Sequence, residues 1–544
     1  MIQLAGTQQV ERAQSQELQD RRVYLPWLWI LLVAMLATGL FFRFTNLDKK
    51  VYWNDEIWRS LRLLGHSGSE MVQQVFDGRE LGAAELQEYQ RINPERGISE
   101  TIKSIAINGS EHPPLYDLIA RAWVQLFGNS IGAIRSLSAV ISLLVFPCLY
   151  WLCRELFESS LTAWITVALM TISPFHVLYA QEAYQYSLWT VTVLLSSAAL
   201  LWAMRLQTRP NWGIYAATVA LGLYTHTLFG FVAIAHGVYV AGFSLGGIKL
   251  RPFRLPKSLT SYLLATVTGL IAYLPWAAVI IITRSNLQPS WLNKNVPLRK
   301  MLRQWSYNFG SVFLDTGGYL YGIGSPMIDL ISLSILFLAA YSIYFLCRRT
   351  PKRTWFFVLT LTGSAFVPLA LADLIWGGQR SAIARYLIPS YLGMQLAFAH
   401  LVAARTFSPS SWERRTGQAL LTLLIGAGIV SCAISSHAEA WWNKAASRNI
   451  PEVARIINRS SRPLVISDSS GLNPWNLISL SYRLHPEVRF RLAVDPKMLT
   501  IPEGFSEVFV FNPSESLRDR LERGERSKIE PVYSDGMLGR LVRE

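Results

Sequence analysis

Residues 27–42 read WLWILLVAMLATGLFF, an unbroken apolar run that VYWNDEIWRSL follows closely at residues 51–61. Similar runs recur along the 544-residue chain, which is 51% hydrophobic and only 16% charged. A soluble protein carries about 25% charged residues. Repeated apolar runs of about twenty residues are typical of helices that cross a bilayer. The sequence therefore predicts a mainly α, polytopic membrane protein.

Hydropathy and length together predict about eleven spans. They cover residues 27–42, 131–152, 161–177, 187–204, 212–224, 229–245, 259–282, 327–346, 355–375, 385–402 and 418–435. We expect a cytoplasmic segment at residues 1–24, a transmembrane domain at 25–435 and a small α/β domain at 436–544. In the last of these, PLVISDS and EVFVFNP are strand-like, whereas PEVARIINR and ESLRDRLER have helical periodicity.

The distribution of basic residues predicts the orientation. One set of loops is rich in Lys and Arg, as in RRTPKR at residues 348–353, whereas the alternate loops at 176–186 and 225–228 have neither. The positive-inside rule then puts the N-terminus on the cytoplasmic side of the cell membrane, and an odd number of spans puts the α/β domain on the outer side. The net charge of +15 is explained by these loops, so no nucleic acid partner is expected.

Two further outer segments are long, at residues 43–130 and 283–326. The first contains HPPLYDLIARAWVQLFG at residues 112–128. Its apolar Trp123 and Phe127 alternate with charged residues, which predicts a helix lying at the membrane interface. Residues 301–305 and 319–321 of the second segment could line a lipid or sugar groove, or could simply pack.

Polar residues gather at the outer ends of the predicted spans. They are Asp55, Glu56, His112, His176, Gln181, Glu182, Tyr184, His226, Arg380 and Arg385. A purely structural set would divide between both sides of the membrane, so this one-sidedness favours a site at the outer face. Ionisable groups held near lipid are costly and tend to mark a reaction or transport site.

The acids are the candidates for proton transfer. Asp55 could be a general base or could orient an acceptor hydroxyl, since a partly desolvated carboxylate has a raised pKa. Glu56 is a less certain candidate for the same chemistry. Glu182 is the stronger candidate of the outer loop at residues 176–186, because a carboxylate in a very short outer loop would face a cavity or an anchor partner. His112, before two prolines, could bind an acceptor, a phosphate or a metal, or could cap a helix. A divalent metal ion could be held by these four residues, although no spacing requires one.

Arg385 and Tyr386 open a span in SAIARYLIPSYLGM. A guanidinium binds phosphate oxygens in a fork and stays charged near lipid. A lipid-phosphate carrier would present such a phosphate at the membrane edge. The competing interpretation is an arginine that snorkels to the headgroups. Arg380 is a weaker candidate for the same role, and Tyr184 can be a belt aromatic.

Five strings, WNDE, EHPPLY, SPFHVLYAQEAYQYSL, YTHTLFGF and ARYLIPSYLGM, occur in an order that resembles the GT-C superfamily of membrane glycosyltransferases. The likeness is to the bacterial branch related to protein O-mannosyltransferases and to the lipid A aminoarabinose transferase, a family 39-like group. It covers residues 27–435. The resemblance implies a GT-C type bundle, a polyprenyl-phosphate-linked sugar donor and an extracytoplasmic acceptor, which could be lipid, glycan or protein.

The resemblance also implies roles for individual residues. Asp55 matches the catalytic acid of the first outer loop, Glu182 the acid of the second, and Arg385 the phosphate-binding arginine. Substrate-binding positions would be His112, Tyr116, Gln181, Tyr184, His226, Arg380, Arg385 and Tyr386. Family members often have QEAR where this chain has QEAY, so phosphate binding would fall to Arg385, Arg380 or Lys294.

The expected reaction is a single displacement that inverts the anomeric carbon. Asp55 would take or orient the acceptor proton, and Arg385 would meet the charge of the leaving phosphate. Two alternatives stay open. One is a transporter or lipid flippase, although these tend to show internal repeats and polar segments at mid-bilayer. The other is an oligosaccharide ligase that uses a lipid pyrophosphate donor.

Overall fold

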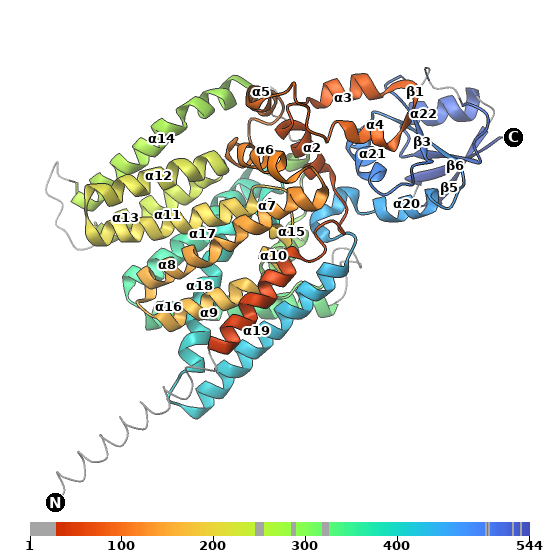
Figure 1. Ribbon diagram of the computed structural model, residues 1–544. Coiled ribbons are helices and arrows are strands. Elements are labelled where there is room, and N and C mark those ends of the chain that lie inside the picture. The colour runs from red at the N-terminus through yellow and green to blue at the C-terminus, as the bar shows by residue number, and fades with distance from the viewer. Residues whose placement is uncertain are drawn as a thin grey trace, which may run out of the picture.

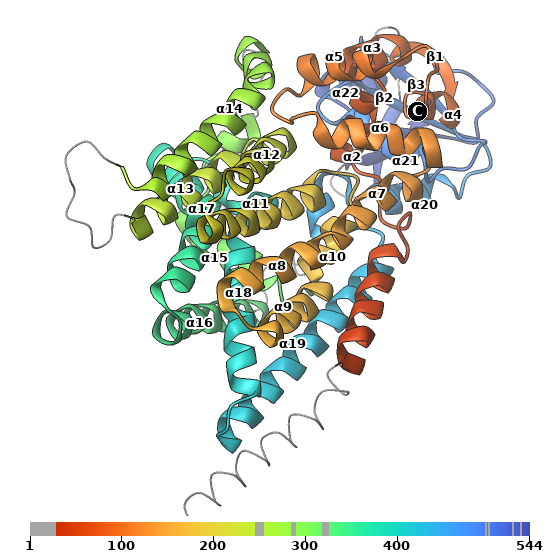
Figure 2. The ribbon, with the colours of Figure 1, turned by 60° about the vertical axis from the view of Figure 1, so that its left-hand side comes forward.

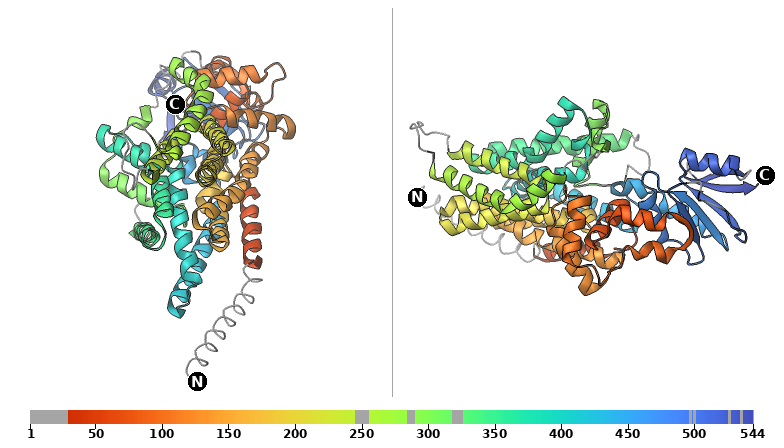
Figure 3. Two further views of the ribbon diagram at one scale, coloured as in Figure 1. Left: turned by 90° about the vertical axis from the view of Figure 1, so that its left-hand side faces the viewer. Right: turned by 90° about the horizontal axis from the view of Figure 1, so that it is seen from above.

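The computed structural model describes residues 29–244, 255–283, 290–317, 326–495, 498, 501–524, 527–533 and 536–543. It has a helical bundle and, at one end of the bundle, a small β-sheet flanked by helices (Figure 1). Two further views show the sheet at the same end of the molecule (Figure 3). The predicted N-terminal segment at 1–24 and residues 319–321 lie outside the described residues.

Within the described residues, seven helices are long and apolar enough to cross a membrane, and one bent pair would make an eighth. The long helices are α7 (Ile131–Leu143) with α8 (Val145–Phe157), α11 (Tyr186–Leu206), α14 (Lys257–Thr283), α16 (Pro326–Arg349), α17 (Lys352–Trp376), α18 (Ile388–Thr406) and α19 (Ser411–His437). Shorter helices are Trp29–Phe44, α12 (Arg209–Thr225) and α13 (Phe229–Ser244). Each predicted span falls on one of these helices or on the bent pair. The helical membrane bundle is confirmed, and the count of eleven spans stays a prediction.

The bent pair consists of α9 (Ser160–Thr171) and α10 (Pro174–Ala180), which meet at 61°. Pro174 is the first residue of α10. Proline has no N–H to continue the hydrogen bonds of α9 but suits the first turn of a new helix, so the chain changes direction here. The bend leads the chain into the short turn at residues 181–185, which holds Glu182.

The first and last helices of the bundle lie side by side (Figure 2). Leu32 and Met35 pack with Ile425 and Ile429 of α19, and Phe42 packs with Cys432. Helix α9 completes this contact: a side chain at Gly39 would meet Thr171, with its Cβ only 2.4 Å from Cγ2. The packing brings the segment after residue 44 next to the segment after residue 437.

Short helices lie between the bundle and the sheet or against the sheet. They are α2 (Asn54–Leu63), α3 (Gly68–Val75), α4 (Ala83–Glu88), α5 (Ile98–Asn108), α6 (Leu115–Phe127) and α15 (Leu298–Gly310), with 3-10 turns η2 (Ser290–Asn293), η3 (Arg380–Ala382), η4 (Ala384–Leu387) and η5 (Trp442–Ser447). Helix α6 buries Asp117 and Arg121 and exposes Leu126 and Phe127. An apolar helix end turned outward fits the predicted place at the membrane interface.

In the described residues the sheet has six strands in the order β1-β3-β2-β4-β6-β5. The strands are β1 (Asp77–Gly82), β2 (Pro463–Asp468), β3 (Arg489–Ala493), β4 (Glu507–Phe511), β5 (Ser527–Tyr533) and β6 (Leu538–Arg543). The central β2 runs parallel to β3 and β4, whereas β1 and β6 pair antiparallel to their neighbours. Helices α20 (Ile450–Ile457), α21 (Asn473–Ser481) and α22 (Glu515–Asp519), with the π-helical turn η7 (Arg520–Gly524), cover the sheet.

Side chains alternate between the two faces of the sheet, as strand geometry requires. Val465 and Phe490 pack with α20, α21 and part of α2. Leu464 and Ile466 pack with Leu517 of α22 on the other face. Strands and helices thus form where PLVISDS, EVFVFNP, PEVARIINR and ESLRDRLER predict them.

Strand β1 is a part of this sheet that the sequence analysis does not predict. It comes from the first outer segment, about 380 residues before β2 in the chain. Its sequence, DGRELG, has no apolar alternation, because it is an edge strand with four of its six residues not buried. The α/β domain is therefore built from two distant pieces of the chain.

Cysteines that replace Glu80 and Arg491 are expected to form a disulfide on mild oxidation. The two residues are direct partners of β1 and β3, and antiparallel partners have Cβ atoms about 4.5–5.5 Å apart. Mass-tagging of free thiols after denaturation measures the loss of two thiols. The control pair, Glu80→Cys with Lys528→Cys, spans opposite edges of the sheet and should stay reduced. Equal oxidation of both pairs would contradict this pairing.

Candidate functional site

Asp55 and Glu56 lie in the first turn of α2, which begins after the extended N-cap residue Trp53. Neighbouring residues of a helix point about 100° apart. The side chain of Asp55 is 25% exposed, whereas that of Glu56 is 0% exposed. One turn of helix therefore gives two adjacent acids different environments, one open and one sealed.

Asp55 faces Arg385 of η4, with 3.4 Å between Oδ2 and Nη2. The Asn54 amide lies 3.2 Å from Oδ1. Nε of Arg385 has no hydrogen-bond partner in the described part of the chain. Three ring centroids lie about 6 Å from the guanidinium carbon, those of Trp53, Tyr186 and Tyr386. The partly exposed carboxylate of Asp55 thus lies beside a guanidinium whose Nε–H is still available to donate. Such an arrangement can bind an anion next to a proton acceptor.

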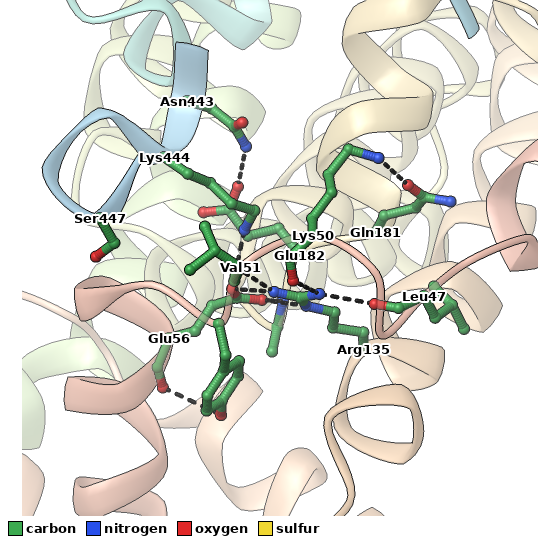
Figure 4. A network of polar contacts seen from close by, with 12 residues as sticks. Leu47, Lys50, Val51, Glu56, Arg135, Gln181, Glu182, Asn443, Lys444 and Ser447 are labelled. Carbon is green, nitrogen blue, oxygen red and sulfur yellow. Dashed lines mark hydrogen bonds and ion pairs between the residues drawn. The ribbon is translucent and has the colours of Figure 1, made fainter. Parts of the chain in front are cut away.

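The carboxylate of Glu56 is occupied on both oxygens. Arg135 binds it in a fork at 2.7 and 2.6 Å, Lys444 donates to Oε2 at 2.9 Å, and the N–H of Ala183 donates to Oε1 at 3.0 Å (Figure 4). Burial by itself would raise the pKa of Glu56, but the two cations outweigh it and lower the pKa to about 2. A carboxylate so engaged is a poor base. The geometry favours a positioning role for Glu56 over the expected catalytic one.

Glu182 is fully buried but only half satisfied. Asn443 donates to Oε2 at 2.6 Å, and Oε1 has no partner among the residues described (Figure 4). Burial raises the pKa of Glu182 to about 7, although the nearby Lys444 and Arg385 act in the opposite direction. A carboxyl group with a free oxygen and a pKa in this range can take up or release a proton near neutral pH.

The neighbouring Gln181 holds the backbone. Its amide nitrogen donates to the carbonyls of Phe42 and Thr45, and its oxygen accepts from Lys50 at 3.0 Å. Both ends of the amide are therefore used to tie this turn to the end of the first helix. The expected substrate contact of Gln181 stays a prediction, and the carbonyl oxygen, which accepts one hydrogen bond here, is the group that could make it.

Tyr184 stands at the position that the resemblance compares with an arginine. Its hydroxyl lies 3.1 Å from Nε2 of His112, and the guanidinium of Arg59 lies 3.8 Å from its ring centroid. Arg59 is bound to Asp117 at 2.6 Å and also to Gln185. A guanidinium is thus present at this place, supplied by α2 and already paired.

His112 also lies 3.2 Å from the Gln185 amide through Nδ1. Burial, with Arg62 and Arg59 nearby, lowers the pKa of His112 well below its ordinary value. His226 stacks on Trp189, with 4.1 Å between centroids, and burial lowers the pKa of His226 to about 3. Both imidazoles are therefore neutral near pH 7 and can act as hydrogen-bonding groups.

The remaining predicted residues have structural contacts. The Tyr116 hydroxyl pairs with Ser138 at 2.7 Å, and His176 pairs with Gln395 at 3.0 Å within the bundle. Arg380 binds Asp373 and Asn293. In the expected groove at 301–305, Trp305 donates to Ser381 at 3.0 Å and Met301 is buried. Tyr386 is half-buried beside Arg385, and Lys294 is exposed.

The sequence analysis gives four residues that could hold a divalent metal ion. No group of three or more His, Cys, Asp or Glu side chains that could hold a metal ion occurs within the described ranges. Glu56 is committed to Arg135 and Lys444, and His112 to Tyr184 and Gln185.

Arg135, Asn443 and Lys444 are site residues that the sequence analysis misses. Arg135 could have been found from the sequence, because it is an ionisable residue within the predicted span 131–152. Ionisable residues inside membrane spans are usually paired or functional. Asn443 and Lys444 had no such signal, since they stand in an unremarkable polar stretch after the last span.

A family model described as dolichyl-phosphate-mannose-protein mannosyltransferase matches residues 111–284. Among solved structures, the apo state of ArnT from Cupriavidus metallidurans matches with a TM-score of 0.52 and 12% identity, covering 94% of this chain and 97% of that one. The chain has the GT-C fold. The likeness to the GT-C superfamily expected from the five strings is thereby confirmed.

Two other matches are weaker. ArnT from the same organism bound to undecaprenyl phosphate has a TM-score of 0.49 at 12% identity, with 94% and 97% coverage. An Archaeoglobus fulgidus oligosaccharyltransferase has a TM-score of 0.47 at 12% identity, and this chain, 85% covered, spans 62% of its length. No curated protein matches significantly in sequence.

Replacing Arg135 by Met is expected to destabilise the fold. The change leaves Glu56 with fewer partners and removes donors from the carbonyls of Leu47, Lys50 and Val51. Breaking a buried ion pair costs about 3–5 kcal/mol. Thermal unfolding in detergent should show a lowered midpoint, whereas the exposed Arg459→Met control should leave it in place. An unchanged midpoint in Arg135→Met would contradict the structural role of the pair.

Proposed function

We propose that the chain is an integral-membrane glycosyltransferase that moves a sugar from a polyprenyl-phosphate carrier to an extracytoplasmic lipid, glycan or protein, with inversion. The observation that carries the proposal is the pair of Asp55 and Arg385, in which an open carboxylate stands beside a cation with an unpartnered Nε in the described structure. The matching family model is named for a polyprenyl-phosphate-linked sugar reaction, which supports the donor class.

In the proposed reaction the acceptor hydroxyl attacks the anomeric carbon of the donor sugar. The new acceptor O–C bond forms as the bond from that carbon to the phosphate oxygen breaks, and its electron pair stays on the phosphate. The acceptor proton passes to Asp55 and from there to water. Arg385 stabilises the charge that develops on the leaving phosphate, and such stabilisation is usually the largest contribution to catalysis. Direct attack inverts the configuration.

Glu182 supports the same step. With a pKa of about 7, Glu182 can take up or release a proton as negative charge moves from Asp55 toward the phosphate. The aromatic rings of Trp53, Tyr186 and Tyr386 supply flat apolar faces around Arg385, suited to a sugar ring and to the first part of a lipid chain. The site end of the bundle, with the α/β domain, would face outward, and the N-terminus would lie in the cytoplasm.

Asp55→Asn is expected to lower the transfer rate on the order of 100-fold or more, because general base catalysis contributes about 10²–10⁴-fold. The assay uses purified protein in lipid, a panel of radiolabelled polyprenyl-phosphate sugars and a crude membrane acceptor fraction. The matched control, Asp519→Asn, changes an exposed acid of α22. Transfer by Asp55→Asn at the wild-type rate would rule out Asp55 as the base.

Arg385→Lys and Arg385→Ala should separate charge from fork geometry. The lysine keeps the charge but loses the planar fork, so it should retain part of the activity, whereas alanine should lose on the order of 100-fold in rate. The measurement is single-turnover transfer from the labelled donor. Equal rates in both variants and the wild type would remove Arg385 from the mechanism.

The product and the donor distinguish the alternatives. Retained anomeric configuration, read by NMR, would contradict direct displacement. Lipid scrambling in proteoliposomes without acceptor would favour a flippase. Transfer from a lipid pyrophosphate donor alone would favour an oligosaccharide ligase.

The transfer rate at saturating donor is expected to rise with pH through about 7, the pKa of Glu182. Glu182 is protonated below this pH and ionised above it. The rate rises because the proposal takes the ionised form, which can accept a proton, as the active one. The phosphodiester of the donor does not titrate in this range. A pH–rate profile of the wild type should therefore show one ascending limb that Glu182→Gln lacks. The same limb in Glu182→Gln would assign it to another group.

A further inference from the structure

Residues 441–447, called the linker below, join the last helix of the bundle to the α/β domain. The linker consists of Trp441 and the 3-10 turn η5. Its side chains point toward the bundle. Figure 4 shows Asn443, Lys444 and Ser447 in one cluster with the buried acids Glu56 and Glu182. Most of these side chains are buried, which is unusual for a connection between two parts of a protein.

A single carboxylate fixes the beginning of the linker. The indole nitrogens of Trp441 and Trp442 donate to Oδ2 of Asp315 at 2.8 and 2.7 Å. Asp315 itself is buried, and the N–H of Gly317 donates to its Oδ1 at 3.0 Å. Two hydrogen bonds to one buried carboxyl group give the linker a defined position before it reaches the acids.

The next two residues bind one acid each. Asn443 donates to Oε2 of Glu182 at 2.6 Å, and Lys444 donates to Oε2 of Glu56 at 2.9 Å. Glu56 in turn accepts from the N–H of Ala183 at 3.0 Å. The turn at residues 181–185 is therefore held at two points. Asn443 binds the side chain of Glu182, and Glu56, itself bound by Lys444, accepts a hydrogen bond from the backbone of Ala183.

The linker also reaches the start of α2. Ser447 accepts from the N–H of Asn54 at 3.3 Å and donates to Asn476 of α21 at 2.8 Å. Nζ of Lys444 lies 5.5 Å from the ring centroid of Trp53, which is also 5.8 Å from Arg385. One short segment thus touches the surroundings of Asp55, Glu182 and Arg385 and a helix of the α/β domain.

We propose that Asn443 and Lys444 are positioning residues for the transfer reaction, which hold Glu182 in place and make the α/β domain part of the catalytic unit. The inference rests on the proposed function. The proposed reaction gives neither residue a reacting atom: Asn443 acts through Glu182, which it binds, and Lys444 acts through Glu56, which it binds, and through its charge near Glu182. A misplacement of about 1 Å can lower an enzymatic rate by about 100-fold, which makes such support necessary.

Asn443 and Lys444 act on Glu182 in different ways. Without Asn443, neither carboxyl oxygen would have a hydrogen-bond partner among the described residues, and the side chain could turn. Without Lys444, Glu182 loses a positive charge that favours its ionised form. Removal of a nearby positive charge raises the pKa of a carboxyl group. The ascending limb of the pH–rate profile should then move to higher pH.

Other charged or titratable groups face Glu182 and stay in place in these variants. They are Glu56, Arg385, Asp55, Arg135, Tyr179 and Tyr186. Glu56 keeps its fork with Arg135 when Lys444 is removed. The chain is therefore expected to fold in Lys444→Met, and thermal unfolding checks this directly.

The test compares Lys444→Met, Lys444→Arg and Asn443→Ala with the wild type in the transfer assay, over a range of pH. Lys444→Met should shift the ascending limb upward by about one pH unit and lower kcat more than it changes the KM of the donor. Lys444→Arg keeps the charge and should restore the wild-type limb. Asn443→Ala should lower kcat about 10–100-fold. Lys528→Met, on the exposed face of β5, is the matched control.

The outcomes are separable. A wild type that transfers sugar, with Lys444→Met and Asn443→Ala that match it in kcat and in pH profile, would overturn this inference and leave the proposed function standing. A lowered kcat with an unmoved limb, equal in Lys444→Met and Lys444→Arg, would also overturn it, since that pattern is one of general damage. A wild type that transfers no sugar from any donor would overturn the proposed function, and this inference with it.

Discussion

The arrangement of the whole site depends on the buried carboxylate of Glu56. It accepts a fork from Arg135, a hydrogen bond from Lys444 and one from the backbone of Ala183. Glu56 itself belongs to α2, and its partners come from α7, the segment after the last span and the turn at residues 181–185. A buried charge without partners costs several kcal/mol, so each of the four segments is held to the others by the same requirement.

This constraint explains why two adjacent acids differ. Glu56 points into the protein interior, where Arg135 and Lys444 balance its negative charge. Asp55 points about 100° away round the helix and faces Arg385, where it is partly exposed. The same network surrounds Glu182 with charges of both signs. Burial and the nearby Glu56 and Asp55 raise the pKa of Glu182, Lys444 and Arg385 lower it, and the pKa that results is about 7. Fixed and adaptable charges thus occur within one cluster.

The bundle was predictable because hydropathy is a local property of the chain, and so were the strands at 463–468 and 507–511. The resemblance carried by the five strings implied that Asp55 and Arg385 belong to one site, but it did not predict their direct pairing. The roles of Gln181 and Arg380 were not predictable, since residue type alone does not tell a satisfied amide or guanidinium from a free one. Lys444 lies 388 positions from Glu56, and no pattern in the sequence links them. Strand β1 was missed because DGRELG lacks the apolar alternation of a buried strand.

The central claim is that Glu56 holds the site together while Asp55 carries out its chemistry. Parallel measurement of the thermal unfolding midpoint and the transfer rate, for Asp55→Asn and Glu56→Gln, tests it most directly. The account predicts that Asp55→Asn keeps the wild-type midpoint and loses transfer, whereas Glu56→Gln lowers the midpoint by several degrees. It would be contradicted if Glu56→Gln kept the wild-type midpoint, or if Asp55→Asn kept the wild-type transfer rate.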